Sequence, residues 1–246
     1  QMTDDGEVDA LVAERVWQET AKALQTQTPS VFFTTLRECG ALKRIFPELD
    51  GLFGVPQPAK WHPEIDTGIH VMMVLDQAAR LSDDLGVRYA ALTHDLGKGT
   101  TPADVLPHHY GHEERSVKLV EALSDRLKVP RELRELAEIV AKYHGLVHKA
   151  EELRADTVLK LLESTDAFRR PQRFELFLLA CEADHRGRTG LEDTPFPQAD
   201  YLRHAFVAAQ SIEPRSLEID GLDGTKIAAR IHDARLDAIK NTANRN

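Results

Sequence analysis

The sequence has few of the features that mark secreted or membrane-embedded proteins. It contains only two cysteines in 246 residues. Cys39 and Cys181 lie far apart and in no metal-ligand spacing, so both are interpreted as reduced structural thiols. No apolar run approaches the roughly 20 residues needed to cross a bilayer. The first ten residues are polar and acidic, unlike a signal or transit peptide. We therefore expect a cytoplasmic protein.

Positive charge is also scarce. The 40 acidic residues outnumber 31 basic ones, and the formal net charge is −9. This balance argues against broad, sequence-blind binding of nucleic acid, which depends on clustered lysine and arginine. The net negative charge is still compatible with a local cluster of basic residues. Arg169, Arg170 and Arg173 are interpreted either as a solvated helix-capping cluster or as an RNA or phosphate contact.

Strand-like alternation and repeats of fixed period are missing as well, whereas helical periodicity dominates. Proline and glycine gather in three stretches that are interpreted as loops, at 51–63, 100–112 and 187–197. The sequence predicts an all-α fold with helices at about residues 10–26, 29–40, 66–81, 87–95, 113–127, 131–144, 155–168, 171–185, 198–211 and 225–241.

Histidine, in contrast, is abundant, with eleven in the chain, and most lie between positions 62 and 148. His94 and Asp95 adjoin at the end of an apolar helical segment. Burial of such a pair is costly unless a partner satisfies it, and a divalent cation does so well. Lys98 follows one helical turn after His94, so its ammonium is a candidate to contact an anion held at the metal.

Neighbouring helices supply further candidate ligands. His70 lies within the apolar segment TGIHVMMVL, and Asp184 ends the apolar segment LFLLACEAD. Each alone is more typical of a satisfied core residue, but with His94 and Asp95 they form a ligand set of the kind found in helical bundles. Imidazole and carboxylate together suit Ni, Co, Mn or Zn better than Ca or Mg. Arg186 and Arg188 are predicted to neutralise phosphate charge beside Asp184.

Other histidines form a second group of candidates. His112 and His144 are predicted to act at or near the metal, either as ligands of a second ion or as contacts around the first. His148 lies four residues after His144 and shares its helix face, so it is a further candidate. We assign no site role to the remaining histidines, and Pro63 is interpreted as a helix start that leaves His62 outside; these histidines are His62, His108, His109, His185, His204 and His232.

The order His70, His94-Asp95, Asp184 resembles the signature of HD-superfamily metallophosphohydrolases. Longer segments resemble the C-terminal HD domain of bacterial tRNA nucleotidyltransferases, the multifunctional CCA-adding enzymes. These segments are KWHPEIDTGIH, HDLGKG, GHEERSV, DAFRRPQR and EADHRGRTG, together with the terminal GTKIAARIHDARLDAI. The resemblance extends from about Val12 to Ile239 and implies an HD-domain helical bundle with flanking helices at both ends.

The resemblance implies an activity and its requirements. It points to a metal-dependent phosphohydrolase with 2′,3′-cyclic phosphodiesterase, 2′-nucleotidase and phosphatase activities. The implied metal is nickel, with magnesium supporting some activities, and cobalt and manganese fit the ligands too. The implied partners are the tRNA 3′ end or 2′-phosphorylated and 2′,3′-cyclic nucleotides, with a homodimer possible and no membrane.

One part of that family is missing from this sequence. No Asp-x-Asp pair occurs to hold the two magnesium ions of a nucleotidyltransferase head, so we do not expect CCA addition. Gln1 before Met2 suggests a fragment. We expect a helical linker at 1–50, an HD domain at 51–212 and a helical tail at 213–246. Two alternatives stay open: a free-standing HD 5′-nucleotidase, and a non-catalytic tRNA-binding or dimerisation scaffold with a structural metal.

Overall fold

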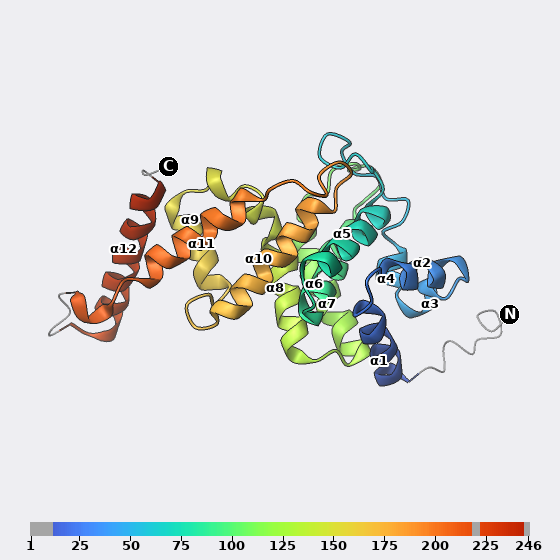
Figure 1. The fold of residues 1–246 in the computed structure, drawn as a ribbon, viewed down its shortest axis with the longest axis horizontal. Helices are drawn as coiled ribbons and strands as arrows, with labels where there is room; N and C mark the ends of the chain where they lie inside the picture. Colours follow the sequence, from blue (N-terminus) through green and yellow to red (C-terminus); the bar gives the residue numbers. More distant parts are fainter. Residues whose placement is uncertain (1–11, 218–221, 244–246) are drawn as a thin grey trace. The chain divides into compact units, whose positions relative to one another are not determined.

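A computed structural model describes residues 12–217 and 222–243, and the polar segment that precedes them in the sequence lies outside this range. Helices are the regular secondary structure of the described residues, which include no β-strand (Figure 1). Its α-helices are α1 (Ala13–Leu24), α2 (Ser30–Glu38), α3 (Leu42–Ile45), α4 (Pro47–Asp50), α5 (Thr67–Leu81), α6 (Leu85–Thr93), α7 (His112–Leu127), α8 (Arg131–Val147), α9 (Ala155–Ser164), α10 (Pro171–Arg186), α11 (Pro197–Gln210) and α12 (Gly224–Ala243). Three short 3-10 helices are η2 (Leu96–Thr100), η3 (Ala150–Glu152) and η4 (Pro214–Ser216).

The all-α prediction is confirmed, and the differences lie at helix ends. Helix α6 begins at Leu85 because the Asp84 carboxylate caps it, accepting hydrogen bonds from the amides of Gly86 and Val87. Helix α9 was expected to reach residue 168 but ends at Ser164, and Asp166 beyond it has a left-handed φ of 56°. The short helices α3 and α4 were not expected as separate elements.

The chain divides into two compact units. The first comprises residues 1–145 and 176–195, and the second comprises residues 146–175 and 196–246. In the first unit, α5 packs against α6, and α7 packs against η2. Fully buried side chains on α5 and α6 include Val71, Leu75, Val87 and Leu92. This helical core carries the histidine-rich segments.

A buried arginine, Arg88, connects helix α1 to this core through hydrogen bonds. The Arg88 side chain on α6 is 4% exposed. Its guanidinium donates hydrogen bonds to the carbonyl oxygens of Leu24 (2.7 Å) and Thr26 (2.9 Å) at the end of α1. It also donates to the carbonyl oxygen of Ser82 (2.8 Å), just after α5. Because these carbonyls end helices and lack partners within them, one side chain satisfies groups from two elements.

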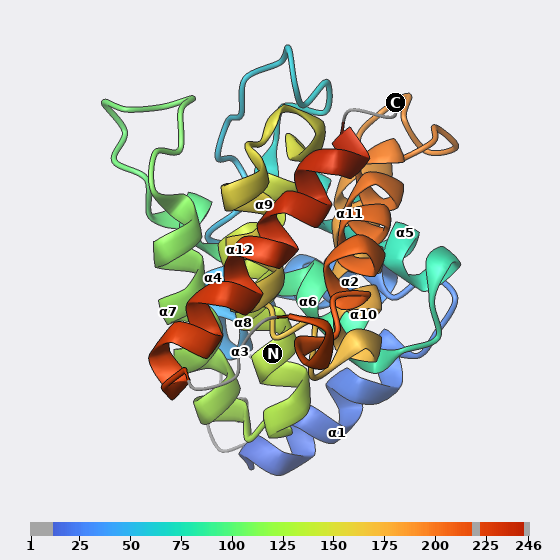
Figure 2. The same ribbon diagram turned by 90° about the vertical axis from the view of Figure 1, so that its left-hand side faces the viewer.

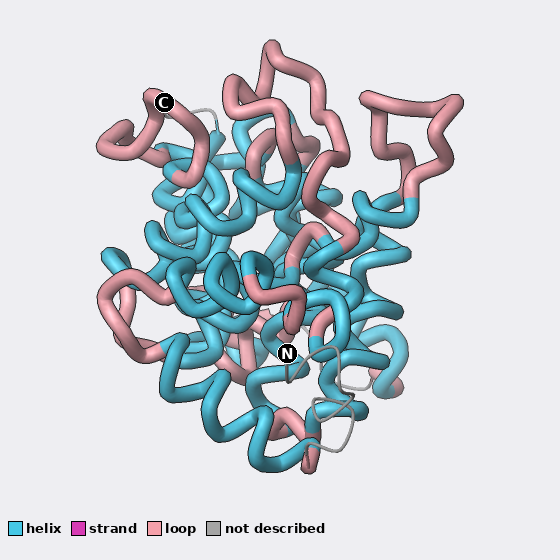
Figure 3. The backbone as a smooth tube through the Cα atoms, turned by 90° about the vertical axis from the view of Figure 1, so that its right-hand side faces the viewer, coloured by secondary structure: helices cyan, strands magenta, loops and turns pink. Residues whose placement is uncertain are grey.

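Two long loops leave the first unit on the same side, residues 51–66 between α4 and α5 and residues 101–111 between η2 and α7 (Figures 2 and 3). They are joined by His109, whose imidazole Nε2 donates to the carbonyl oxygen of Pro56 (3.1 Å). Its Nδ1 accepts from the Thr101 hydroxyl at 2.8 Å. The hydrogen bond from His109 to Pro56 therefore connects the two loops directly.

The second unit consists mainly of α9, α11 and α12. Helix α12 packs on α11 and α9, and its Ile239 is fully buried. The Arg235 guanidinium lies 3.9 Å from the centre of the Phe168 ring. No helix among the described residues is both long and apolar enough to span a bilayer.

Candidate metal centre

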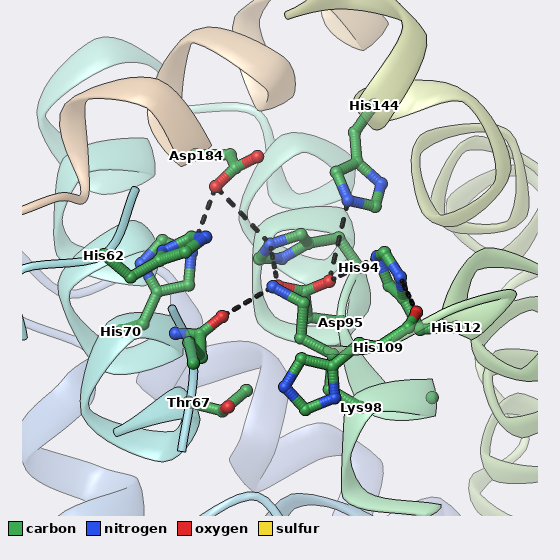
Figure 4. A network of polar contacts seen from close by, with 12 residues as sticks. His62, Thr67, His70, His94, Asp95, Lys98, His109, His112, His144 and Asp184 are labelled. Carbon is green, nitrogen blue, oxygen red and sulfur yellow. Dashed lines mark hydrogen bonds and ion pairs between the residues drawn. The ribbon is translucent and has the colours of Figure 1, made fainter. Parts of the chain in front are cut away.

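A cluster of histidines and carboxylates lies in the first unit, where five helical segments converge (Figure 4). The sequence places these residues far apart, but the fold brings all of the predicted ligands and both second-group candidates together. They are His70 on α5, His94 and Asp95 between α6 and η2, His112 at the start of α7, His144 near the end of α8, and Asp184 on α10.

The end of α6 sets the position of His94 and Asp95. The helix stops at Thr93, one residue before His94, and the 3-10 turn η2 follows directly after Asp95. Gly97 in this turn allows α7 to approach closely, because a Cβ atom there would collide with the carbonyl oxygen of His112. The Gly97 amide also donates to the Ser116 hydroxyl on α7 (2.8 Å). This close packing places His112 beside Asp95.

Three imidazoles have the same tautomer, since their Nδ1 atoms lie within hydrogen-bond distance of carbonyl oxygens, which can only accept. His94 donates to Ala91, His112 to His109 and His144 to Val140, at 2.8, 2.8 and 3.0 Å respectively. The proton therefore lies on Nδ1 in each ring. When each ring is neutral, its Nε2 atom presents a lone pair to the cluster, as a metal ligand must.

The carboxylates lie between these nitrogen atoms. Asp184 Oδ1 lies 3.0 Å from His70 Nε2 and 3.7 Å from His94 Nε2. Asp95 Oδ2 is 3.1 Å from His94 Nε2. Asp95 Oδ1 faces the other side, 3.3 Å from His112 Nε2 and 3.6 Å from His144 Nε2. Asp95 therefore joins two groups of potential ligands through its two oxygens.

The cluster is deeply buried, and burial together with neighbouring charges shifts the pKa values of its side chains. Burial opposes ionisation of Asp95, but His94 and Lys98 outweigh it and hold the pKa of the carboxyl well below its ordinary value. Burial also opposes protonation of His94, yet Asp95 and Asp184 outweigh it and raise the pKa of the imidazole. Burial lowers the pKa of His144 to about 3. Asp95 is therefore ionised at neutral pH, as binding of a cation requires.

The predicted cationic residues occupy different places. Lys98 lies in η2 rather than on a continuing helix, and its Nζ contacts Asp95 Oδ2 (2.7 Å) and Gln57 Oε1 (2.6 Å). The Arg188 guanidinium is 3.8 Å from Asp184 Oδ2. Arg186 instead pairs along its own helix with Glu182 at 2.6 Å. Lys98 and Arg188 thus stand against the two carboxylates of the cluster, whereas Arg186 makes its ion pair outside it.

Two functional-site neighbours were missed from the sequence. Pro63 does not start α5, which begins at Thr67 and is capped by Asp66, and the loop before it folds back on the cluster. The loop residue His62 lies 4.6 Å from His70, ring centre to ring centre. Its Nδ1 is 3.0 Å from Glu64 Oε1. Burial lowers the pKa of His62 to about 4. The only sequence signal for a site role of His62 and Glu64 is their residue types, a histidine and a glutamate separated by one residue.

Four other candidate residues lie elsewhere. His148 belongs to the second unit, where its ring packs against Phe196, 5.7 Å between ring centres. Arg169, Arg170 and Arg173 gather around the Asp166 carboxylate, at 2.6, 3.6 and 3.7 Å. The arginine run is therefore paired with an acid in this structure.

The residues of the cluster fit a divalent metal ion. Several of their inward-facing atoms are buried without forming a hydrogen bond within the described chain, namely His94 Nε2, Asp95 Oδ1 and His112 Nε2. Leaving such atoms unsatisfied is costly, and one or two bound cations would satisfy them. The ligand atoms of His70, His94 and Asp95 lie within 4.8 Å of one another, as do those of His94, His144 and Asp184.

Comparison with known families agrees with this geometry. Residues 67–170 match the HD domain family. Residues 5–52 match a family described as a probable RNA and SrmB-binding site of polymerase A. The segment that carries five of the six residues of the cluster therefore matches the HD domain family.

The chain is also similar to proteins named multifunctional CCA protein. It is 62% identical to that of Thioalkalivibrio sulfidiphilus over 240 residues, covering 98% of this chain and 59% of the relative. The protein of Nitrosococcus oceani is 59% identical over 239 residues, covering 97% and 59%. That of Burkholderia vietnamiensis is 55% identical over 241 residues, covering 98% and 58%. The chain spans less than two thirds of the length of these relatives.

Proposed function

We propose that this chain is the phosphohydrolase part of a tRNA CCA-adding and repair enzyme and hydrolyses 2′,3′-cyclic and 2′-phosphate esters. The observation that carries the proposal is the convergence of His70, His94, Asp95 and Asp184 in one buried cluster. High identity to multifunctional CCA proteins supports the substrate class. The match of residues 5–52 to an RNA-binding family supports a tRNA partner. We also propose the division into linker 1–50, HD domain 51–212 and tail 213–246.

His70, His94, Asp95 and Asp184 would hold the metal ion. Their mixed nitrogen and oxygen donors favour nickel, cobalt or manganese over calcium, and the resemblance to CCA-adding enzymes favours nickel with magnesium in some activities. When bound, such an ion lowers the pKa of water and polarises a phosphoryl oxygen. His112 and His144 share Asp95 with this set and are proposed as ligands of a second ion or as supports of the first.

The surrounding cations would bind the phosphate. Lys98 and Arg188 contact the two ligand carboxylates, so a phosphate brought to the cluster meets positive charge on both sides. Arg186 is a weaker candidate for this role because it pairs with Glu182. In the neutral form of His94, His112 and His144, the carbonyl bonds at Nδ1 place the lone pair on Nε2, where a cation would bind.

Metal analysis paired with a substrate panel tests the proposal. The purified protein should bind one or two divalent ions and hydrolyse 2′,3′-cyclic AMP and 2′-AMP when Ni, Co, Mn or Mg is added. A preference for 5′-dAMP over these substrates would instead identify a free-standing HD 5′-nucleotidase.

A His94→Ala variant gives a residue-level test. Loss of one of four ligands should reduce hydrolysis by at least about 100-fold, by analogy with other metal-site changes, while the helical circular dichroism spectrum is retained. Asp95→Ala should behave alike. Full activity in both variants would refute the ligand assignment.

One observation favours a second function. His70, His94, Asp95 and Asp184 are each at most 3% exposed, and closed sites with four protein ligands are typical of structural metals. The chain would then be a tRNA-binding or dimerisation scaffold. Tight tRNA binding by a metal-loaded protein that shows no turnover on any substrate of the panel would establish this alternative.

A further inference from the structure

We propose that Glu64 is a positioning residue that fixes the tautomer and orientation of His70. This inference rests on the proposed metal-dependent function, because orientation of His70 matters only if its Nε2 is a ligand. Glu64 belongs to the loop before α5, and no sequence pattern singled it out.

The Glu64 carboxylate joins three segments of the first unit. Its side chain is 2% exposed. Oε1 lies 2.9 Å from His70 Nδ1 on α5 and 3.0 Å from His62 Nδ1 in the loop. Oε2 accepts a hydrogen bond from the backbone amide of Thr189 (3.3 Å), in the segment that follows Asp184 and Arg188. One carboxylate therefore contacts α5, which carries His70, and the segment that follows α10, the helix that carries Asp184.

Glu64 does for His70 what backbone carbonyls do for the other rings. His94, His112 and His144 each donate Nδ1–H to a carbonyl oxygen. At His70, Nδ1 faces a carboxylate oxygen of Glu64 at 2.9 Å, and Nε2 faces a second carboxylate oxygen, that of Asp184, at 3.0 Å. A cation that took Nε2 and Asp184 as ligands would leave the ring proton on Nδ1, where Glu64 is its acceptor. A carboxylate accepts a stronger hydrogen bond than a carbonyl and makes the opposite nitrogen a better ligand.

The backbone beside Glu64 supports a specific role. Ile65 has φ 62°, a left-handed conformation that is a marked exception for a β-branched residue. Its side chain is 48% exposed, so packing does not explain the conformation. The turn lets the residues on both sides face inward: Glu64 toward His70, and Asp66 to cap α5 by accepting from the Ile69 amide (3.0 Å). Strain of this kind persists where the surrounding contacts hold it.

The test compares Glu64→Gln with Asp193→Asn. Gln keeps the size of the side chain but removes its charge. Asp193 lies on the segment after α10 and is 85% exposed, so its replacement is the matched control. Isothermal titration with Zn²⁺ should show an affinity about 10- to 100-fold weaker for Glu64→Gln, the usual effect of changing a carboxylate behind a histidine ligand. Asp193→Asn should bind as the wild type does.

A spectroscopic readout separates positioning from general stability. Long-range ¹H–¹⁵N spectra of the zinc-loaded protein should show the ring proton of His70 on Nδ1 and the metal on Nε2 in the wild type, and more than one state of this ring in Glu64→Gln. A proton on Nε2 of His70 in the zinc-loaded wild type overturns the proposal even if the variant does not fold. Equal zinc affinity in wild type and Glu64→Gln also overturns it and leaves the metal function intact. A wild type that binds no zinc refutes both.

Discussion

At the scale of single residues, the centre is organised around the Asp95 carboxylate, and Lys98 is the residue that competes for it. The ammonium lies 2.7 Å from Asp95 Oδ2, the oxygen that also faces His94. Without a metal, this cation is the strong partner of the buried carboxylate. A metal ion that used the same oxygen would be repelled by Lys98, so the residue has opposite effects on metal binding and on phosphate binding.

Lys98→Met should therefore separate these two effects. We expect metal affinity to rise about tenfold or more, since nearby unit charges interact by several kcal/mol even at an effective dielectric of about 20. The kcat/KM for 2′,3′-cyclic AMP should fall because a phosphate-binding cation is lost. Isothermal titration and steady-state kinetics on the same preparation measure both. Weaker metal binding in Lys98→Met would show that the lysine supports the site instead.

Neutral histidines make the fold sensitive to acid. Burial, and then the charge of Lys98, lower the pKa of His109 from 6.5 to about 4. In the unfolded chain the imidazole takes up its proton near pH 6.5, but in the folded chain it does so only near 4. Its contribution to stability is therefore complete above pH 6.5 and is lost as the pH falls through this window.

We predict that the free energy of unfolding of the metal-free protein decreases between about pH 6.5 and 4, and that His109→Gln makes this decrease less steep. Urea titrations at a series of pH values give the slopes. The other titrating groups are the same in both proteins, so the difference between the two slopes reports the His109 imidazole. Parallel curves for wild type and variant would exclude His109 as a source of the acid sensitivity.

At the scale of elements, hydrophobic periodicity predicted the long helices because each buries one face against the core. It failed where a cap or a turn decides the outcome. Asp84 extends α6 toward its N-terminus, and the left-handed Asp166 follows the early end of α9. The predicted ligands were recognisable because a histidine or aspartate in an apolar segment is unusual. Glu64 and His62 were not, since the loop conformation that buries them depends on contacts with α5 and the segment after α10.

The attachment of helix α1 to the core through Arg88 is also decided at the scale of elements. The Arg88 guanidinium replaces the partners missing from the last carbonyls of α1. Arg88→Met should lower the free energy of unfolding by about 3 kcal/mol or more, because several buried carbonyls then lose a charged donor. Arg131, 89% exposed and paired with Glu135, is the control. Arg131→Met should change the stability by less than about 1 kcal/mol. Similar urea midpoints for the two variants would contradict the prediction.

At the scale of the whole molecule, all of the proposed ligands belong to the first compact unit. Bound metal should stabilise this unit specifically. At a free metal concentration 100 times the dissociation constant, the gain is about 2.7 kcal/mol. Addition of EDTA reverses it.

Hydrogen exchange measures which helices the bound metal stabilises. We expect amide protection to increase on metal binding in α5, α6 and η2, with α11 and α12 unchanged. Uniform protection throughout the chain would mean that the two units unfold as one.

The requirement for glycine at position 97 has a consequence for mutational screens. The absent side chain of Gly97 is what lets the backbone of η2 meet that of α7 at His112 and Ser116, although glycine contributes no group to the chemistry. In a saturation screen for hydrolysis, position 97 should therefore tolerate no substitution, as if it were a ligand. A screen scored on activity alone would count it among the reactive residues, whereas its requirement is for empty space.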